Sequence, residues 1–89
     1  MRFDWDPKKA ASNLKKHGIA FEEAASVFAD PLGRLVEDAL YGDRMVMIGV
    51  SGKRRLLFTV FAEVAEDAIR IISARRVTSH ERRYYEEGT

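Results

Sequence analysis

The spacing of apolar and polar residues predicts helices in the amino-terminal part of the chain and strands after them. Apolar residues alternate with polar ones over 2–5, which predicts a short strand. Asp6 and Pro7 favour the start of a helix, because aspartate caps a first turn and proline is tolerated there, and Gly18 favours its end. On this helix we expect a thin inner stripe of Ala10, Leu14 and His17, with Ala11 beside it.

The remaining pattern predicts a second helix and then a run of strands. Phe21, Ala24, Ala25 and Phe28 repeat at helical spacing, and 30–33 holds the proline and glycine that end the helix. Continuous or alternating apolar residues predict strands over 34–37, 44–50, 54–62 and 68–76. Polar turns are expected between the last three of these strands, at 51–53 and 63–67.

A capping box marks the last helix. Thr78 is placed to accept the backbone N–H of Glu81, whose side chain can return to Thr78. In the strand before it, simple alternation places Ile71 and Ala74 on opposite faces. A strand, two helices, an antiparallel meander of about four strands and a terminal helix together predict an α+β domain.

The composition fits one domain over 1–89. With 46% hydrophobic and 33% charged residues, the chain can bury a modest core. The absence of cysteine excludes disulfides, thiolate metal sites and cysteine nucleophiles, and favours a reducing compartment. No apolar stretch approaches the roughly 20 residues that span a bilayer, and no signal-peptide core follows Met1. We therefore expect a cytoplasmic protein without a membrane partner.

The net charge of +1 conceals a segregation of charge along the chain. Residues 1–18 carry +3 from five basic and two acidic side chains, and 19–43 carry −5 from one basic and six acidic side chains. Residues 44–89 carry +3 from nine basic and six acidic side chains. This pattern allows a locally positive surface to meet phosphates while another face stays acidic.

The strongest candidates for chemistry are five arginines of the last strand, the corner after it and the last helix: Arg70, Arg75, Arg76, Arg82 and Arg83. Guanidinium groups bind phosphate at two points and stay charged at physiological pH. Arg75 and Arg76 are adjacent on a strand, however, so we expect them on opposite faces. Arg82 and Arg83 also have glutamates four residues further on, so phosphate recognition and surface ion pairing are both open.

A second basic cluster and two histidines complete the polar candidates. Lys53, Arg54 and Arg55 lie in a predicted turn, which is either a solubilising turn or a further phosphate contact at one end of the sheet. His17 and His80 are the side chains whose ordinary pKa lies near neutrality, so they are the first candidates for proton transfer. Taken singly, each histidine also fits a structural role.

Other chemistries find little support in the sequence. The acidic residues form no paired carboxylate cage with a histidine companion, so we expect neither a metal nor a cofactor. The glycine-rich phosphate loop of nucleotide hydrolases is absent. Tyr84 and Tyr85 are adjacent on the last helix, where one can stack on a nucleobase while the other packs on the sheet.

Several separated segments follow one another in a pattern that resembles a known family. They are Phe3-Asp4-Trp5-Asp6, Lys9-Ala10 to Asn13, Lys16-His17-Gly18, Phe21-Glu22-Glu23-Ala24, Val27-Phe28-Ala29-Asp30-Pro31, Ile48-Gly49-Val50-Ser51, and Ile71-Ile72-Ser73-Ala74-Arg75-Arg76 with Thr78, Glu81, Arg82 and Tyr85. In this order and spacing, over nearly the whole chain, they resemble the BrnT toxins of type II toxin-antitoxin systems.

The resemblance implies a bacterial ribonuclease toxin with a compact RelE-like fold that inhibits translation and growth. It implies neutralisation by a BrnA-like antitoxin, whose other end binds DNA as a ribbon-helix-helix module, so that this chain contacts DNA only through its partner. It also implies RNA cleavage without a metal, because the 2′-hydroxyl of the substrate attacks the adjacent phosphorus and cationic side chains stabilise the developing charge.

The resemblance further implies catalytic roles for particular residues. Arg75 and Arg76, in the matching Ser-Ala-Arg-Arg segment, are expected to stabilise the transition-state charge and to position the phosphate. His17, in the matching Lys-His-Gly segment, is the candidate for proton transfer. Glu81 is its rival, although the capping box can occupy this carboxylate.

Three further basic residues are expected to bind RNA. Arg55 and Arg82 would orient the strand, and Lys53 would add non-specific attraction. The competing interpretation is a non-catalytic module that holds RNA or a protein partner on the same basic face. RNA cleavage distinguishes the enzyme from the binding module.

Overall fold

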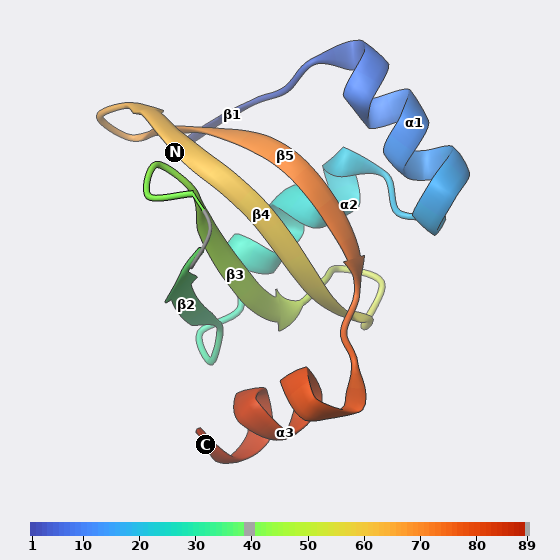
Figure 1. The fold of residues 1–89 in the computed structure, drawn as a ribbon, viewed down its shortest axis with the longest axis vertical. Helices are drawn as coiled ribbons and strands as arrows, with labels where there is room; N and C mark the ends of the chain where they lie inside the picture. The colour runs from blue at the N-terminus through green and yellow to red at the C-terminus, as the bar shows by residue number, and fades with distance from the viewer. Residues whose placement is uncertain (39–40, 89) are drawn as a thin grey trace.

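The computed structural model describes residues 1–38 and 41–88, and within them it confirms the predicted α+β order of elements. One sheet has the strand order β1-β5-β4-β3-β2, with helices packed around it (Figure 1). The elements are β1 (Arg2–Asp4), α1 (Pro7–His17), α2 (Phe21–Ser26), the 3-10 helix η1 (Val27–Ala29), β2 (Arg34–Glu37), β3 (Met45–Val50), β4 (Leu56–Ala65), β5 (Ala68–Arg76) and α3 (Ser79–Glu87).

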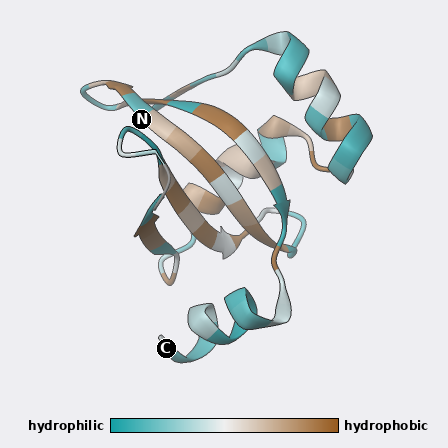
Figure 2. Cartoon of the chain, viewed as in Figure 1, coloured by the Kyte–Doolittle hydropathy of each residue, from teal (hydrophilic) through white to brown (hydrophobic). Residues whose placement is uncertain are grey.

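The predicted meander is present, since β2 to β5 pair antiparallel in chain order. The amino-terminal strand β1 pairs parallel with β5 and forms one edge of the sheet, and β2 forms the other. Figure 1 shows α2 behind the sheet and α3 at one end of it, beyond the carboxyl end of β5. Hydrophobic segments are concentrated in the strands and α2, whereas α3 is largely hydrophilic (Figure 2).

The sheet separates two apolar clusters. On the face of α1 and α2, Phe21, Val27, Leu57 and Ile71 are almost fully buried and form the centre of the larger cluster. Trp5, just after β1, packs on this cluster with its ring nearly perpendicular to that of Phe21. The smaller cluster on the other face has Val46, Ile48 and Leu56 at its centre, with side chains of α3 packed against it.

The predicted inner stripe of α1 is correct only at Ala10, which packs on the larger cluster, because Leu14 and His17 are exposed and Asn13 is the buried residue. The Asn13 amide donates to the carbonyls of Ile19 and Ala74 at 3.0 and 2.9 Å, and its oxygen accepts the N–H of Ala74 at 3.1 Å. A buried amide is tolerated when its polar atoms are paired. These bonds orient the polar Asn13 toward β5 and leave Leu14 in solvent.

The predictions for the strands over 54–62 and 68–76 also need correction. The strand predicted over 54–62 begins at Leu56 and continues to Ala65, so the turn before β5 is shorter than expected. Irregular pairing of β4 with β5 changes the expected alternation, because Val60 pairs with Ser73 and Phe61 with Ile71, which leaves one extra residue in β5. Ile71 and Ala74 therefore share the larger cluster, although alternation predicted opposite faces.

The register places the β3–β4 turn next to the end of β5. Val50 pairs with Leu56 on either side of this turn, and Leu57 pairs with Arg76 at the end of β5. The N–H of Val77 then donates to the Leu56 carbonyl at 3.4 Å, which keeps the corner before α3 beside β4. No helix among the described residues is long and apolar enough to cross a membrane.

Candidate functional site

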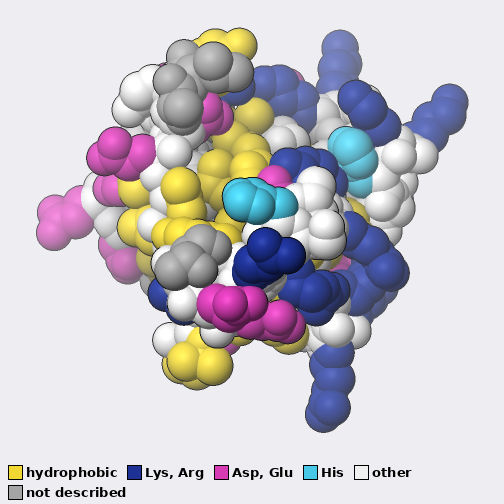
Figure 3. All heavy atoms as spheres, turned by 60° about the horizontal axis from the view of Figure 1, so that its bottom comes forward, with side chains coloured by type: hydrophobic (Ala, Val, Ile, Leu, Met, Phe, Trp, Pro, Cys, Tyr) yellow, Lys and Arg dark blue, Asp and Glu magenta, His cyan; other side chains and the backbone are white. Residues whose placement is uncertain are grey.

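Four arginines converge on a hollow of about 340 Å³ where the β3–β4 turn, the end of β5 and the start of α3 meet. We call it the basic hollow, and it is lined by Val50, Arg54, Arg55, Leu56, Arg76, Val77 and Arg82. On the face of the molecule that contains α3, Lys and Arg side chains gather on one side (Figure 3). Three of the predicted site residues, Arg55, Arg76 and Arg82, are therefore brought together, although they lie on three different elements.

A buried carboxylate holds the β3–β4 turn in place. The side chain of Glu23, from α2, is only 3% exposed and accepts a hydrogen bond of 2.7 Å from the Ser51 hydroxyl. The same hydroxyl oxygen accepts the backbone N–H groups of Lys53 and Arg55 at 3.2 and 3.3 Å. The hydrogen bond from Arg55 is the main reason that the Glu23 pKa lies below its ordinary value, and Ser51 adds to it.

The Arg55 guanidinium is engaged in intramolecular hydrogen bonds, so it is less available for a ligand than predicted. Its Nε donates to Glu23 at 2.9 Å, and its Nη2 bonds the second oxygen of the same carboxylate. The same Nη2 reaches the Gly18 carbonyl at 3.4 Å. These contacts join α1, α2 and the turn, so Arg55 lines the hollow chiefly as the residue that fixes its wall.

Three other arginines supply the available positive charge of the hollow. Arg54 and Arg76 form no ion pair with any residue of 1–38 or 41–88, and Arg82 reaches only Glu86, at 4.0 Å and in solvent. Arg54 adopts a left-handed backbone with φ 61°, which is costly for a residue with a side chain. The sequence pattern placed Arg54 in a basic turn but did not single it out as a site residue. Its unusual backbone is visible only in the structure.

Arg75 and Arg76 lie on opposite faces, as predicted, so they do not share one site. Arg75 pairs with Phe58 and Arg76 with Leu57, and those two partners belong to the two different apolar clusters. The Arg75 guanidinium binds both oxygens of Glu81, at 2.8 and 2.9 Å. It also lies 4.1 Å from the centre of the Phe58 ring.

Glu81 is held as a carboxylate by several donors. The hydrogen bond from Arg75 contributes most to lowering the pKa of Glu81, and the backbone N–H of Thr78 adds to this effect at 2.9 Å. The predicted capping box between Thr78 and Glu81 is confirmed. A carboxylate with a lowered pKa and these partners is poorly suited to proton transfer near neutral pH, which weakens the case for Glu81.

The remaining predicted residues do not line the hollow. His17 ends α1 and is exposed, and the next carbonyl, that of Gly18, is the one that Arg55 contacts. Lys53 is exposed on the β3–β4 turn. His80 borders a separate concavity beside α3 with Glu81 and Tyr84. Arg70 lies at the other end of β5 and pairs with Asp4 at 2.7 Å.

The described part of the chain contains no assembled set of metal ligands. Within residues 1–38 and 41–88, no group of three or more histidine, aspartate and glutamate side chains is placed to hold an ion. The carboxylates of Glu23 and Glu81 are instead paired with arginines. The hollow therefore offers guanidinium groups to an anionic ligand.

Comparisons with known proteins identify a family and a similar fold. A family model described as the ribonuclease toxin BrnT of type II toxin-antitoxin systems matches residues 5–81. The fold is similar to a 1.1 Å crystal structure of the Brucella abortus ribonuclease toxin BrnT, with a TM-score of 0.73 and 23% identity. That likeness covers 89% of this chain and 99% of the other. A search of curated proteins gave no match.

Proposed function

We propose a function on the premise that the chain belongs to the BrnT family of ribonuclease toxins of type II toxin-antitoxin systems. In this proposal the protein is an endoribonuclease that cleaves RNA at the basic hollow without a metal. Membership of this family implies an antitoxin partner. The observation that carries the proposal is the convergence of Arg54, Arg76 and Arg82 on one concavity without strong ion pairs among the described residues. Free guanidinium groups in a hollow are suited to a phosphodiester.

The reaction that this site would promote uses a nucleophile within the RNA. The 2′-hydroxyl loses its proton and attacks the adjacent phosphorus, the bond from phosphorus to the 5′-oxygen breaks, and the leaving oxygen takes up a proton. Negative charge increases on the non-bridging oxygens in the transition state, so fixed cations accelerate the step. We assign the stabilisation of this charge to Arg76, and binding of the phosphate or its neighbours to Arg54 and Arg82, because all three line the hollow.

The other predicted residues take supporting roles in this proposal. Arg75 acts through Glu81 by fixing α3, and Arg55 acts through Glu23 by fixing the β3–β4 turn. Lys53 adds attraction for the RNA backbone from the exposed part of that turn. His17 is retained as the proton-transfer group, because it ends α1 beside the carbonyl that Arg55 contacts.

We further propose that the partner is a BrnA-like antitoxin with a ribbon-helix-helix DNA-binding module. The chain would then contact DNA only through this partner and would act on RNA in the cytoplasm as a single domain over 1–89. An acidic segment over the arginines is the simplest way to neutralise the toxin, because it would compete with RNA for the same charges. A partner bound elsewhere on the chain is the other possibility.

A non-catalytic binding module is the second candidate function, and one observation favours it. The hollow is lined by arginines and apolar residues, and both histidines lie outside its lining. Arginines hold phosphate without any chemical step, whereas cleavage needs a proton acceptor. In this alternative the same surface binds RNA or a protein partner, and RNA is released intact.

The test is RNA cleavage in excess chelator by the native protein and two variants. Arg76→Ala removes a charge from the hollow, whereas Arg83→Ala removes an exposed arginine of α3 that does not line it. We expect cleavage by the native protein and by Arg83→Ala, and a large loss in Arg76→Ala. Cleavage that stops in chelator and returns with Mg²⁺ would contradict metal independence. Salt-dependent RNA binding without cleavage, even with ribosomes, would select the binding module.

A further inference from the structure

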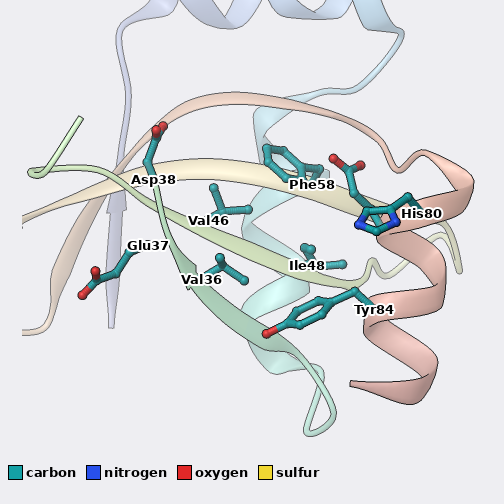
Figure 4. A pocket seen from close by; sticks show the side chains of 9 residues that line it. Val36, Glu37, Asp38, Val46, Ile48, Phe58, His80 and Tyr84 are labelled. Carbon is teal, nitrogen blue, oxygen red and sulfur yellow. The ribbon is translucent and has the colours of Figure 1, made fainter. Parts of the chain in front are cut away.

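An apolar groove of about 300 Å³ lies between α3 and the sheet. Its apolar and aromatic lining comes from Val36, Val46, Ile48, Phe58 and Tyr84. Figure 4 shows side chains of β2, β3 and β4 along one side and His80 and Tyr84 of α3 along the other. Its polar lining is Glu37, Asp38, His80 and Glu81.

The two adjacent tyrosines of α3 both pack against the smaller apolar cluster but differ in their other contacts. The Tyr85 hydroxyl donates to Asp30 at 2.6 Å, and burial together with this bond raises the pKa of Tyr85 to about 12. Asp30 also accepts the N–H groups of Leu32 and Val50, so Tyr85 is part of the bonded framework that holds α3. The Tyr84 hydroxyl forms no such bond with any described residue, and its half-buried ring lines the groove with the Arg34 guanidinium 5.6 Å from the ring centre.

The groove and the basic hollow are neighbours across the corner between β5 and α3. Arg76, Val77 and Arg82 line the hollow, whereas His80 and Glu81, between them in sequence, line the groove. On β4, Leu56 lines the hollow, and Phe58, two residues on and on the same face, lines the groove. In Figure 3 the hydrophobic side chains of this face adjoin the basic ones.

We propose that the apolar groove is a nucleobase subsite, which receives an unpaired base of the RNA strand whose phosphate lies in the basic hollow. This inference rests on the proposed function, because it takes RNA as the ligand of the hollow. Proteins that bind single strands combine a basic groove for the backbone with aromatic side chains that stack on bases. Tyr84 supplies the aromatic ring, and exposed His80 supplies a polar group at the edge of the groove.

Charge favours a nucleobase over a peptide as the occupant. Arg54, Arg76 and Arg82 line the neighbouring hollow and attract a chain that carries a phosphate at every residue. The groove itself adds no such attraction, because its charged lining residues include Glu37, Asp38 and Glu81. A base is flat and mostly apolar on its faces, so it can enter an apolar slot while its phosphate stays with the arginines. A segment of the antitoxin is the alternative occupant, and the experiment distinguishes the two.

The test compares two uncleavable chains that differ only in their bases. Short 2′-O-methyl oligoadenylate lacks the attacking hydroxyl, and an abasic chain of the same length and phosphate count serves as its partner. We expect the native protein to bind oligoadenylate about 5- to 150-fold more tightly, which corresponds to the roughly 1–3 kcal/mol of one stacked base. Backbone NMR signals of Ile48 and Tyr84 should shift with oligoadenylate and not with the abasic chain.

Variants test whether the difference in affinity between the two chains arises in the groove. Tyr84→Leu keeps an apolar side chain but removes the ring, and Val36→Phe fills the groove from β2, so both should remove the preference for bases. Tyr41→Leu makes the same exchange at an exposed tyrosine outside the lining and should retain it. Folding of each variant is checked by circular dichroism, and binding of the abasic chain reports on the hollow alone.

The outcomes are distinct from those of the proposed function. Equal binding of the two chains by the native protein, or a base preference that survives in both Tyr84→Leu and Val36→Phe, would overturn the inference. Groove signals that move only with a purified antitoxin would also overturn it and assign the groove to a protein. Cleavage of unmodified RNA is measured in parallel, so a base preference without cleavage supports the subsite and contradicts the ribonuclease.

Discussion

Arg75 binds both carboxylate oxygens of Glu81, with Nη1–Oε1 and Nη2–Oε2 distances of 2.8 and 2.9 Å. Because the same carboxylate accepts the N–H of Thr78, this pair joins the first turn of α3 to the end of β5. Arg76, the next residue, lines the basic hollow and forms no ion pair with any described residue. In the proposed function, the two adjacent arginines therefore have different roles, a structural one for Arg75 and a ligand-binding one for Arg76.

This division predicts opposite effects of two neighbouring substitutions. Arg75→Ala should lower the free energy of unfolding by roughly 1 kcal/mol, since it removes a partly exposed two-point pair and a ring contact. Arg76→Ala should change it by less than about 0.5 kcal/mol but slow RNA cleavage by about 100-fold or more. Urea denaturation and initial cleavage rates measure the two effects. A stable, inactive Arg75→Ala beside a fully active Arg76→Ala would reverse the assignment.

Thr59 offers a second prediction, on stability alone. It is fully buried at the centre of β4, and its hydroxyl has no hydrogen-bond partner in the described structure. Thr59→Val should therefore raise the free energy of unfolding by about 1 kcal/mol, because it removes an unpaired buried polar group. The matched exchange Thr78→Val removes the cap of α3 and should lower it by about 1 kcal/mol. A loss of stability in Thr59→Val would mean that the hydroxyl is paired in solution.

Glu23 predicts how stability depends on pH. Its pKa in the folded protein lies below the ordinary 4.5, chiefly because of the hydrogen bond from Arg55. The stabilisation of the fold by ionised Glu23 is therefore complete above about pH 4.5 and is lost as pH falls through the lower pKa of the folded protein. Glu23→Gln should lower the free energy of unfolding at pH 7 by roughly 1–3 kcal/mol.

The pH dependence distinguishes this effect from a simple loss of packing. The difference between the native protein and Glu23→Gln should shrink as pH falls below about 4.5, as followed by urea denaturation at a series of pH values. Glu22→Gln, at an exposed neighbour on α2, is the control and should keep the native acid profile. A difference that stays constant down to pH 2 would show that charge at Glu23 does not stabilise the fold.

Local signals were sufficient to predict most of the fold. Asp6 with Pro7, Gly18 and the box of Thr78 with Glu81 act within a turn of where they lie, and each is confirmed at its position. The stripe on α1 was wrong at Leu14 and His17 because Asn13 is buried through a contact that is not local. The carbonyl and N–H of Ala74, which bind the amide of Asn13, are 61 residues away in sequence.

The candidate site was harder to predict, because its parts come together only through sheet register. The arginine content indicated phosphate, and alternation correctly separated Arg75 from Arg76. The sequence pattern did not reveal which arginines form ion pairs within the protein, since Glu23, the partner of Arg55, lies 32 residues away in sequence. The extra residue near Ile72 in β5 also has no signal in the sequence pattern.

Arg54 gives the most direct link between backbone and function. Its φ of 61° is favoured by glycine, so Arg54→Gly should keep the free energy of unfolding constant or raise it by up to about 1 kcal/mol. Cleavage and RNA binding should nevertheless weaken, because the variant removes a charge from the basic hollow. Thermal unfolding and salt titrations of RNA binding measure the two effects, and the salt dependence should become shallower in the variant.

Asp67 supplies a matched control for the same backbone change, because it also has φ 61° and lies far from the hollow, in the β4–β5 turn. Asp67→Gly relieves the same strain and gives up only an exposed contact with the terminal amine of Met1, so its stability should change as in Arg54→Gly while cleavage stays at the native rate. If both glycine variants cleave RNA equally well, Arg54 does not bind the substrate. If only Arg54→Gly loses activity while both fold, the strained backbone is retained for the side chain that it directs into the hollow.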